Sequence, residues 1–181
     1  MIAALLSGLP ASAAVQTDGQ QRCINAANGA ARKLATAVGK EVSRCVKKGG
    51  QGKEPDAATC VESSARVAAA RASLTAATDR ACGEAPDFGF TGASTAGAAV
   101  EDQGRELVAS LFGADPQAAM AVGDDTGARC QAAATAGAAS LLGQEWKAAT
   151  ATKKEALRSA ADAGALGDAV AAGVSGDRGV T

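Results

Sequence analysis

Apolar and polar residues alternate with the period of a helix between residues 17 and 45. Apolar or small side chains recur every three or four positions, as on one buried helix face: Cys23, Ile24, Ala27, Ala31, Leu34, Val38, Val42 and Cys45. Thr17 and Gln20 have the spacing of a capping box, in which each residue satisfies a backbone N–H group of the other. The sequence therefore predicts a long amphipathic helix that begins here.

Four cysteines in this half of the chain are arranged with mirror symmetry. Cys23 and Cys45 are 22 residues apart, as are Cys60 and Cys82, and the midpoint lies in residues 49–53. Twenty-two helical residues span about 33 Å, whereas a disulfide needs Cα atoms about 4.4 to 6.8 Å apart. Two antiparallel helices with a short turn bring Cys23 to Cys82 and Cys45 to Cys60. Pairing Cys23 with Cys60 would require a connection that runs back along the whole helix.

These features predict a disulfide-stapled helical hairpin over residues 17–83. The return helix is expected to start around Glu54-Pro55-Asp56, because proline is favoured in a first helical turn, and to stop at Gly83. Reflection about the midpoint places Val38 opposite Val67, so apolar residues are also expected to meet across the hairpin.

A second helical region is predicted over residues 94–172. Its apolar spacing indicates a helix from about Thr95 to Phe112, a short helix from Asp115-Pro116 to Val122, and a longer helix from Asp125 or Thr126 past Trp146 to Arg158. Beyond Gly164 we expect only a weak alanine-rich turn, and residues 173–181 are predicted to be disordered. The predicted fold class is all-α: a disulfide-stapled antiparallel helical hairpin followed by a second helical hairpin or small bundle.

The few aromatic residues, 2% of the chain, are expected to serve packing. Phe88 and Phe90 lie in the predicted linker 84–92, where a hydrophobic plug against the hairpin end is favoured over an exposed recognition loop. Trp146 is also interpreted as a packing residue. Because helices with so few large apolar side chains bury little area, we expect the disulfides to contribute much of the stability.

The formal net charge of -1 does not favour bulk attraction to nucleic acids or anionic membranes, and no nucleic-acid partner is predicted. Positive charge is nevertheless concentrated in the first helix and turn, at Arg22, Arg32, Lys33, Lys40, Arg44, Lys47, Lys48 and Lys53. Asp18, Glu41 and Glu54 are set against them. A solvated helix face is the favoured interpretation, and an anionic partner is the alternative.

Residues 1–13 resemble the end of a secretory signal peptide, with an apolar run followed by small residues at Ala11-Ser12-Ala13 and cleavage expected near Ala14. The positive charge that usually opens such a peptide is missing, and an apolar arm packed on the bundle is the alternative. No other run is long enough to span a bilayer. Since disulfides persist in oxidising compartments, we predict a periplasmic or extracellular protein.

Cys130 is the fifth cysteine and has no predicted partner within the chain. It is expected either to be buried and inert or to be available for an intermolecular disulfide with a protein partner. A catalytic thiol is the least favoured interpretation, because the chain has no His to act as its base.

The lack of histidine excludes the Ser-His-Asp and Cys-His catalytic systems and histidine zinc sites. Residues 49–53 lack the glycine spacing and the Ser or Thr of a phosphate-binding Walker loop. Asp124-Asp125 lacks the alternating ligands of a calcium loop and is better explained as a helix cap. We therefore predict no catalytic residue, metal site or cofactor, and no enzymatic activity.

Several short strings are similar to sequences of a group of uncharacterised, cysteine-rich, exported helical proteins of environmental Gram-negative bacteria. They are residues 23–28, Gly39-Lys40, residues 45–49, residues 86–90, Leu111-Phe112-Gly113 and Arg129-Cys130-Gln131. The resemblance covers most of residues 20–150 and implies export and disulfide bonding, but no activity. Members of that group carry a further cysteine in the second helical region. No cysteine follows Cys130 in this chain, so the lack of that further cysteine would account for the unpaired Cys130.

The favoured function is that of an exported, disulfide-stabilised helical protein with a non-enzymatic structural or interaction role. The alternative is a binder of an anionic or apolar ligand, through the basic helix face or a groove beside Phe88, Phe90 and Trp146. An enzyme or a membrane-active toxin is the least favoured class, because no residue pattern indicates its chemistry.

Overall fold

The computed structural model describes residues 15–53, 56–113 and 115–176 of the chain. All regular structure in these residues is helical: α1 (Asp18–Gly50), α2 (Ala57–Glu62), α3 (Ala65–Ala81), α4 (Ala93–Phe112), α5 (Asp125–Ala156) and α6 (Ala163–Gly176). Together with disulfides between Cys23 and Cys82 and between Cys45 and Cys60, these helices confirm the predicted all-α class and its disulfide-stapled hairpin. The predicted signal-like segment, residues 1–13, lies outside the described residues, as do residues 177–181 of the predicted tail.

Helix α1 begins where the sequence predicts. Thr17 Oγ1 accepts a hydrogen bond from the backbone N–H of Gln20 at 3.2 Å, and Gln20 Oε1 accepts one from the backbone N–H of Thr17 at 3.0 Å. Both halves of the capping box are therefore formed. The apolar face of α1 is buried along its length, from Cys23 to Val46.

The return arm of the hairpin is two helices rather than one, which differs from the prediction. Helix α2 ends at Glu62, and α3 starts anew with Ser64 as its N-cap. The Ser63 hydroxyl donates to the Thr59 carbonyl at 2.8 Å, while Ser64 Oγ accepts from the backbone N–H of Val67 at 3.4 Å. Serine hydroxyls compete with backbone groups for hydrogen bonds, and the pair interrupts the helix here.

Residues 115–122 form turns, so the predicted short helix is wrong. The Asp115 side chain does accept a hydrogen bond from the backbone N–H of Ala118 at 3.0 Å, as a helix cap would. The Gln131 side chain of α5, however, accepts from the backbone N–H of Ala121 at 2.9 Å and donates to the Ala119 carbonyl at 2.7 Å. These tertiary hydrogen bonds satisfy backbone groups that a helix would pair internally.

The end of the chain is more helical than predicted. Asp124 caps α5, which covers the expected long helix. Helix α6 extends to Gly176, where only a weak turn and the start of a disordered tail were expected. Asp162 Oδ1 accepts a hydrogen bond from the backbone N–H of Ala165 at 2.8 Å, and Leu166 is buried against α5. Capping and burial stabilise this helix, whereas the composition of the segment alone does not distinguish a helix from a weak turn.

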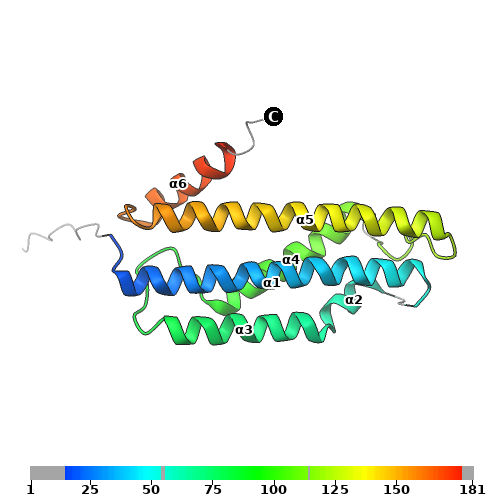
Figure 1. Cartoon of the computed structure of the whole chain (residues 1–181), viewed down its shortest axis with the longest axis horizontal. Helices are drawn as coiled ribbons and strands as arrows, with labels where there is room; N and C mark the ends of the chain where they lie inside the picture. Colours follow the sequence, from blue (N-terminus) through cyan, green and yellow to red (C-terminus); the bar gives the residue numbers. More distant parts are fainter. Residues whose placement is uncertain (1–14, 54–55, 114, 177–181) are drawn as a thin grey trace, which may run out of the picture.

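Helix α1 is the centre of the bundle. In Figure 1, α5, α1 and α3 lie side by side, and α4 crosses behind α1. Helices α2, α3, α4 and α5 all pack on α1, whereas α6 packs on α5. The region 94–172 therefore does not stand apart as a second hairpin, because both of its long helices use α1 as their support.

The apolar core is divided into two clusters. The larger one lies between α1, α3 and α4 and includes Leu34, Val38 and Leu74. The smaller one lies where α1 begins and α5 ends, and consists of Ile24, Leu157, Ala160 and Leu166. The apolar packing at the end of α5 is therefore separate from the larger cluster between α1, α3 and α4.

Candidate functional site

Both disulfides join α1 to the return arm of the hairpin. Cys23 pairs with Cys82 and Cys45 with Cys60, with Cα–Cα distances of 4.6 Å and 5.9 Å. These are the pairs that the mirror spacing of the cysteines predicts. One bridge closes the end of α3 onto the start of α1, and the other closes α2 onto the end of α1. All four cysteines are consequently used in holding the hairpin.

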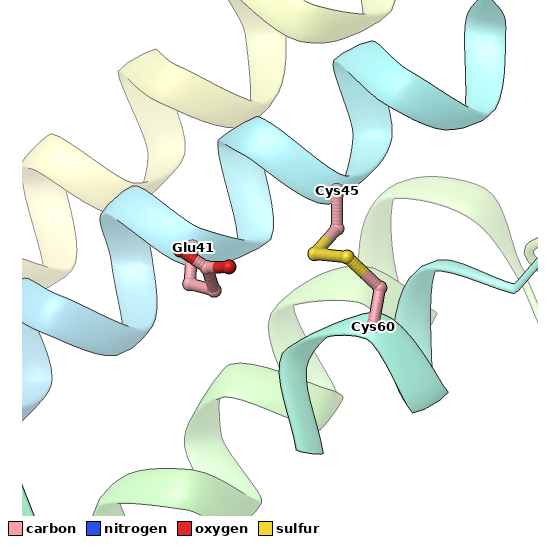
Figure 2. Close-up of side chains that lie close together, drawn as sticks. All are labelled: Glu41, Cys45 and Cys60. Atoms are coloured by element: carbon pink, nitrogen blue, oxygen red, sulfur yellow. A yellow bond between two sulfur atoms is a disulfide. The ribbon is translucent and has the colours of Figure 1, made fainter. Parts of the chain in front are cut away.

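A buried carboxylate lies beside the second bridge. Glu41, 2% exposed, and Cys45 are one turn apart on α1, and Cys60 faces them from α2 (Figure 2). A Glu41 carboxylate oxygen and the two Sγ atoms all lie within 4.8 Å of one another. Arg44 Nε donates to Glu41 Oε1 at 2.6 Å, and Arg44 Nη2 lies 3.9 Å from Cys60 Sγ. The guanidinium group therefore contacts both the carboxylate and the bridge.

Burial alone would raise the pKa of Glu41, because it disfavours the charged carboxylate. Hydrogen bonds from the side chains of Arg44 and Ser64 act in the opposite direction, as does the positive charge of Arg44 with a further contribution from Arg66. Together they place the pKa of Glu41 below its ordinary value. The carboxylate is thus favoured in its charged form, and one of the groups that favour it, Ser64, is the N-cap of α3.

This cluster has the ligand types of a cysteine-carboxylate metal site, but its arrangement does not favour one. A thiolate is the ligand that binds metals, and here the two sulfurs are bonded to each other. Arg44 also places a positive charge against Glu41 and Cys60. The cluster is better suited to anchoring the junction between α2 and α3 on α1.

The burial of Glu41 was not predicted from the sequence, where this residue belongs to a basic segment interpreted as a solvated helix face. A signal was present, because Glu41 precedes Cys45 by four residues and follows Val38 by three. Residues at these spacings share one helix face. The acidic residue could thus have been placed on the buried face from spacing alone, although its partners could not.

The basic residues predicted on the first helix and the turn that follows it lie on the surface, as the solvated-face interpretation requires. All are exposed apart from the half-buried Lys48. Beside them, α1 packs on α5 through small residues. A Cβ atom added to Gly39 would lie 3.1 Å from Ala139 Cβ, and one added to Gly50 would lie 2.6 Å from Ala128 Cβ. The two helix backbones therefore approach closely, and shallow grooves follow their line of contact.

Two grooves lie along the α1–α5 line of contact, with volumes of about 490 Å³ and 430 Å³. Their basic lining residues are Arg32, Lys40 and Lys147 in the first groove and Lys47 and Arg129 in the second. Asp125 is the acidic residue in the lining. Within the described part of the chain, none of the five basic residues forms an ion pair within 4.0 Å. The grooves therefore carry a concentration of uncompensated positive charge.

The aromatic residues proposed to form one ligand groove lie in two different places. Phe88 and Phe90 pack against the cluster of Ile24 and Leu157, which agrees with their interpretation as a plug. Trp146 packs against the other core cluster, and its indole N–H donates to Gln103 Oε1 at 2.7 Å. The structure therefore does not bring the three rings together into one site.

Cys130 is a free, exposed cysteine on α5. The interpretation of a buried, inert thiol is therefore wrong. The remaining expectation, an intermolecular disulfide, is sterically permitted.

No protein-family model, curated protein or solved structure matches the chain.

Proposed function

We propose that this is an exported, disulfide-stabilised helical protein with a non-enzymatic structural or interaction role in the periplasm or the extracellular space. Two disulfide bridges in a hairpin support this compartment, because such bonds persist where the environment is oxidising. No helix in the described residues is both long and apolar enough to cross a membrane.

The uncompensated basic grooves between α1 and α5 are the observation that favours interaction over a purely structural role. Exposed basic side chains that form no ion pair in the described residues, with Asp125 as the one acidic residue among those lining the two grooves, are available to an external anion. The other notable polar cluster, around Glu41, has its hydrogen bonds within the protein. A non-enzymatic role also agrees with the lack of histidine in the sequence.

Export is tested by expressing the whole chain in a Gram-negative host and fractionating the cells. We expect the protein in the periplasm or medium, cleaved near Ala14, with Cys23 linked to Cys82 and Cys45 to Cys60 in non-reduced peptide maps. A variant with Leu5→Arg and Leu6→Arg, which interrupts the apolar run of residues 1–13, should stay in the cytoplasm. Wild-type protein that is cytoplasmic, uncleaved and reduced would contradict the proposal.

A further inference from the structure

We infer that the α1–α5 grooves bind an acidic α-helix of a partner protein. The inference rests on the proposed interaction role and names the chemistry of the partner. It is carried by the length of the grooves, the size of the side chains in them and the distribution of charge along their edges.

The two grooves follow one another along the same pair of helices. On α1 and its C-cap their lining extends from Arg32 to Gln51, and on α5 it extends in the opposite direction from Lys147 to Asp125. Nineteen helical residues correspond to about 28 Å. A ligand that contacts the whole surface must therefore be long, and a helix of roughly five turns has this length.

Small residues line the middle of the surface. Gly39 of α1 and Ala136, Ala139 and Gly143 of α5 face the first groove, and Ala128 and Ala132 face the second. Helices pack at interaxial distances of about 8 to 10 Å, at the short end where the contacting side chains are small. The surface can thus accept another helix at close range, so that α1 and α5 would be two members of a three-helix group.

The basic residues lie at positions that flank such a helix. Lys40 and Lys47 of α1 are seven residues apart, while Arg129 and Lys147 come from α5. In coiled coils, charged residues that repeat every seven positions beside the apolar contact select the partner helix. A helix with Glu or Asp at the matching positions would form ion pairs with both α1 and α5, whereas a basic helix would be repelled.

The lining favours a helix over a flexible polyanion. Neither groove is lined by an aromatic residue, and single-stranded nucleic acids depend on aromatic side chains on which their bases stack. The net charge of -1 also gives no long-range attraction to a duplex. Shape and local charge together therefore select an acidic helix.

The test measures binding of a synthetic helical peptide to the purified, oxidised protein by fluorescence anisotropy. The peptide is roughly three heptads long, with Ala at positions a and d, Glu at e and g and Gln elsewhere. Its helicity is checked by circular dichroism. The same peptide with Lys in place of Glu, and disordered polyglutamate of matched charge, serve as ligand controls. We expect saturable binding of the acidic helix, weakened by salt, and no binding of the basic helix.

Two protein variants with equal net charge distinguish the contribution of the grooves to binding from that of the rest of the surface. Lys40→Glu with Lys147→Glu should raise the Kd of the acidic helix about tenfold or more. Arg22→Glu with Arg80→Glu, at exposed positions that line neither groove, should change the Kd less than about threefold. Circular dichroism and intact disulfides confirm that each variant is folded.

A third variant, Ala136→Leu, fills the groove without altering its charge, because Ala136 is exposed there. It should weaken the acidic helix and leave any residual polyglutamate binding unchanged. The inference is overturned if the acidic helix does not bind, or if polyglutamate binds as tightly and Ala136→Leu has no effect. Since this experiment uses purified oxidised protein, its failure is distinct from a failure of export, which fractionation measures.

Discussion

Helix α1 packs on the return arm of the hairpin on one side and on α5 on another, and the two sides are held by different means. Against α2 and α3 there are two disulfides and buried Val and Leu side chains, including Leu34 and Leu74. Against α5 much of the contact is made through Gly and Ala, as at Gly39 and Gly50, and there is no covalent bond between the two helices among the described residues.

The difference concerns how a chain poor in large apolar residues stabilises long helices. Disulfides compensate for limited apolar burial by reducing the entropy of the unfolded chain. Small residues act differently, because they allow two backbones to approach and keep long side chains at the edges of the contact. The α5 side is consequently where exposed Lys and Arg residues border a groove, and the proposed interaction surface lies on the side without bridges.

The largest effect is expected when both bridges are removed by replacing the four paired cysteines with Ser. Loss of the Cys23–Cys82 bridge, which spans 59 residues, should lower the free energy of unfolding by roughly 4 kcal/mol on the chain-entropy model. Hydrogen exchange should increase more in α2 and α3 than in α5. Chemical denaturation with circular dichroism measures the loss, and unchanged stability would show that packing alone holds the hairpin.

A smaller loss is expected from a single methyl group on the α5 side. In Gly50→Ala the added Cβ would lie 2.6 Å from Ala128 Cβ, so α1 and α5 must separate. Overpacking of this kind typically costs about 1 to 3 kcal/mol. The matched control is Gly29→Ala, where the added atom meets nothing within 4 Å and should stabilise α1 by up to about 1 kcal/mol. Equal changes in the thermal unfolding of Gly50→Ala and Gly29→Ala would contradict the close approach of α1 and α5 at Gly50.

On the bridged side, Glu41→Gln tests the buried carboxylate. It keeps the size of the side chain but weakens the hydrogen bonds with Arg44 and Ser64, for an expected loss of about 1 to 3 kcal/mol at neutral pH. Glu62→Gln is the control, since the Glu62 side chain is 59% exposed and should change stability by less than about 0.5 kcal/mol. A Glu41→Gln variant as stable as the wild type would show that the charged carboxylate does not anchor the junction between α2 and α3.

The same carboxylate predicts a dependence on pH. The pKa of Glu41 is lower in the folded protein than its ordinary value of 4.5, so the folded state binds this proton more weakly than the unfolded state. Its contribution is complete above that ordinary value and is lost as pH falls through the lowered pKa. The melting midpoint of the wild type should therefore fall more on acidification than that of Glu41→Gln. Parallel curves for the two proteins would count against this linkage.

The smallest effect on stability is expected from Cys130→Ser on α5. Because the side chain is exposed, the free energy of unfolding should change by less than about 0.5 kcal/mol. If the thiol forms an intermolecular bridge, a dimer of the wild type on non-reducing gels should be missing from this variant. A large loss of stability would show that the cysteine has contacts that its exposure does not indicate.

The sequence by itself determined the local features of the stapled side. The capping box at Thr17, the apolar face of α1 and the pairing of Cys23 with Cys82 and Cys45 with Cys60 all depend on spacing along one helix. A helix has a fixed rise and period, so such spacing translates directly into position. For this reason the hairpin could be predicted without any knowledge of the other helices.

Only the tertiary structure decided what packs on the remaining faces of α1. The sequence did not predict that α5 lies on Gly39 and Gly50, that Glu41 is buried beside Ser64, or that Phe88 and Trp146 belong to separate clusters. Gly, Ala and Ser are nearly as compatible with a buried helix face as with an exposed one, so their periodicity does not identify a partner. That choice depends on which surfaces fit together when all the helices are present.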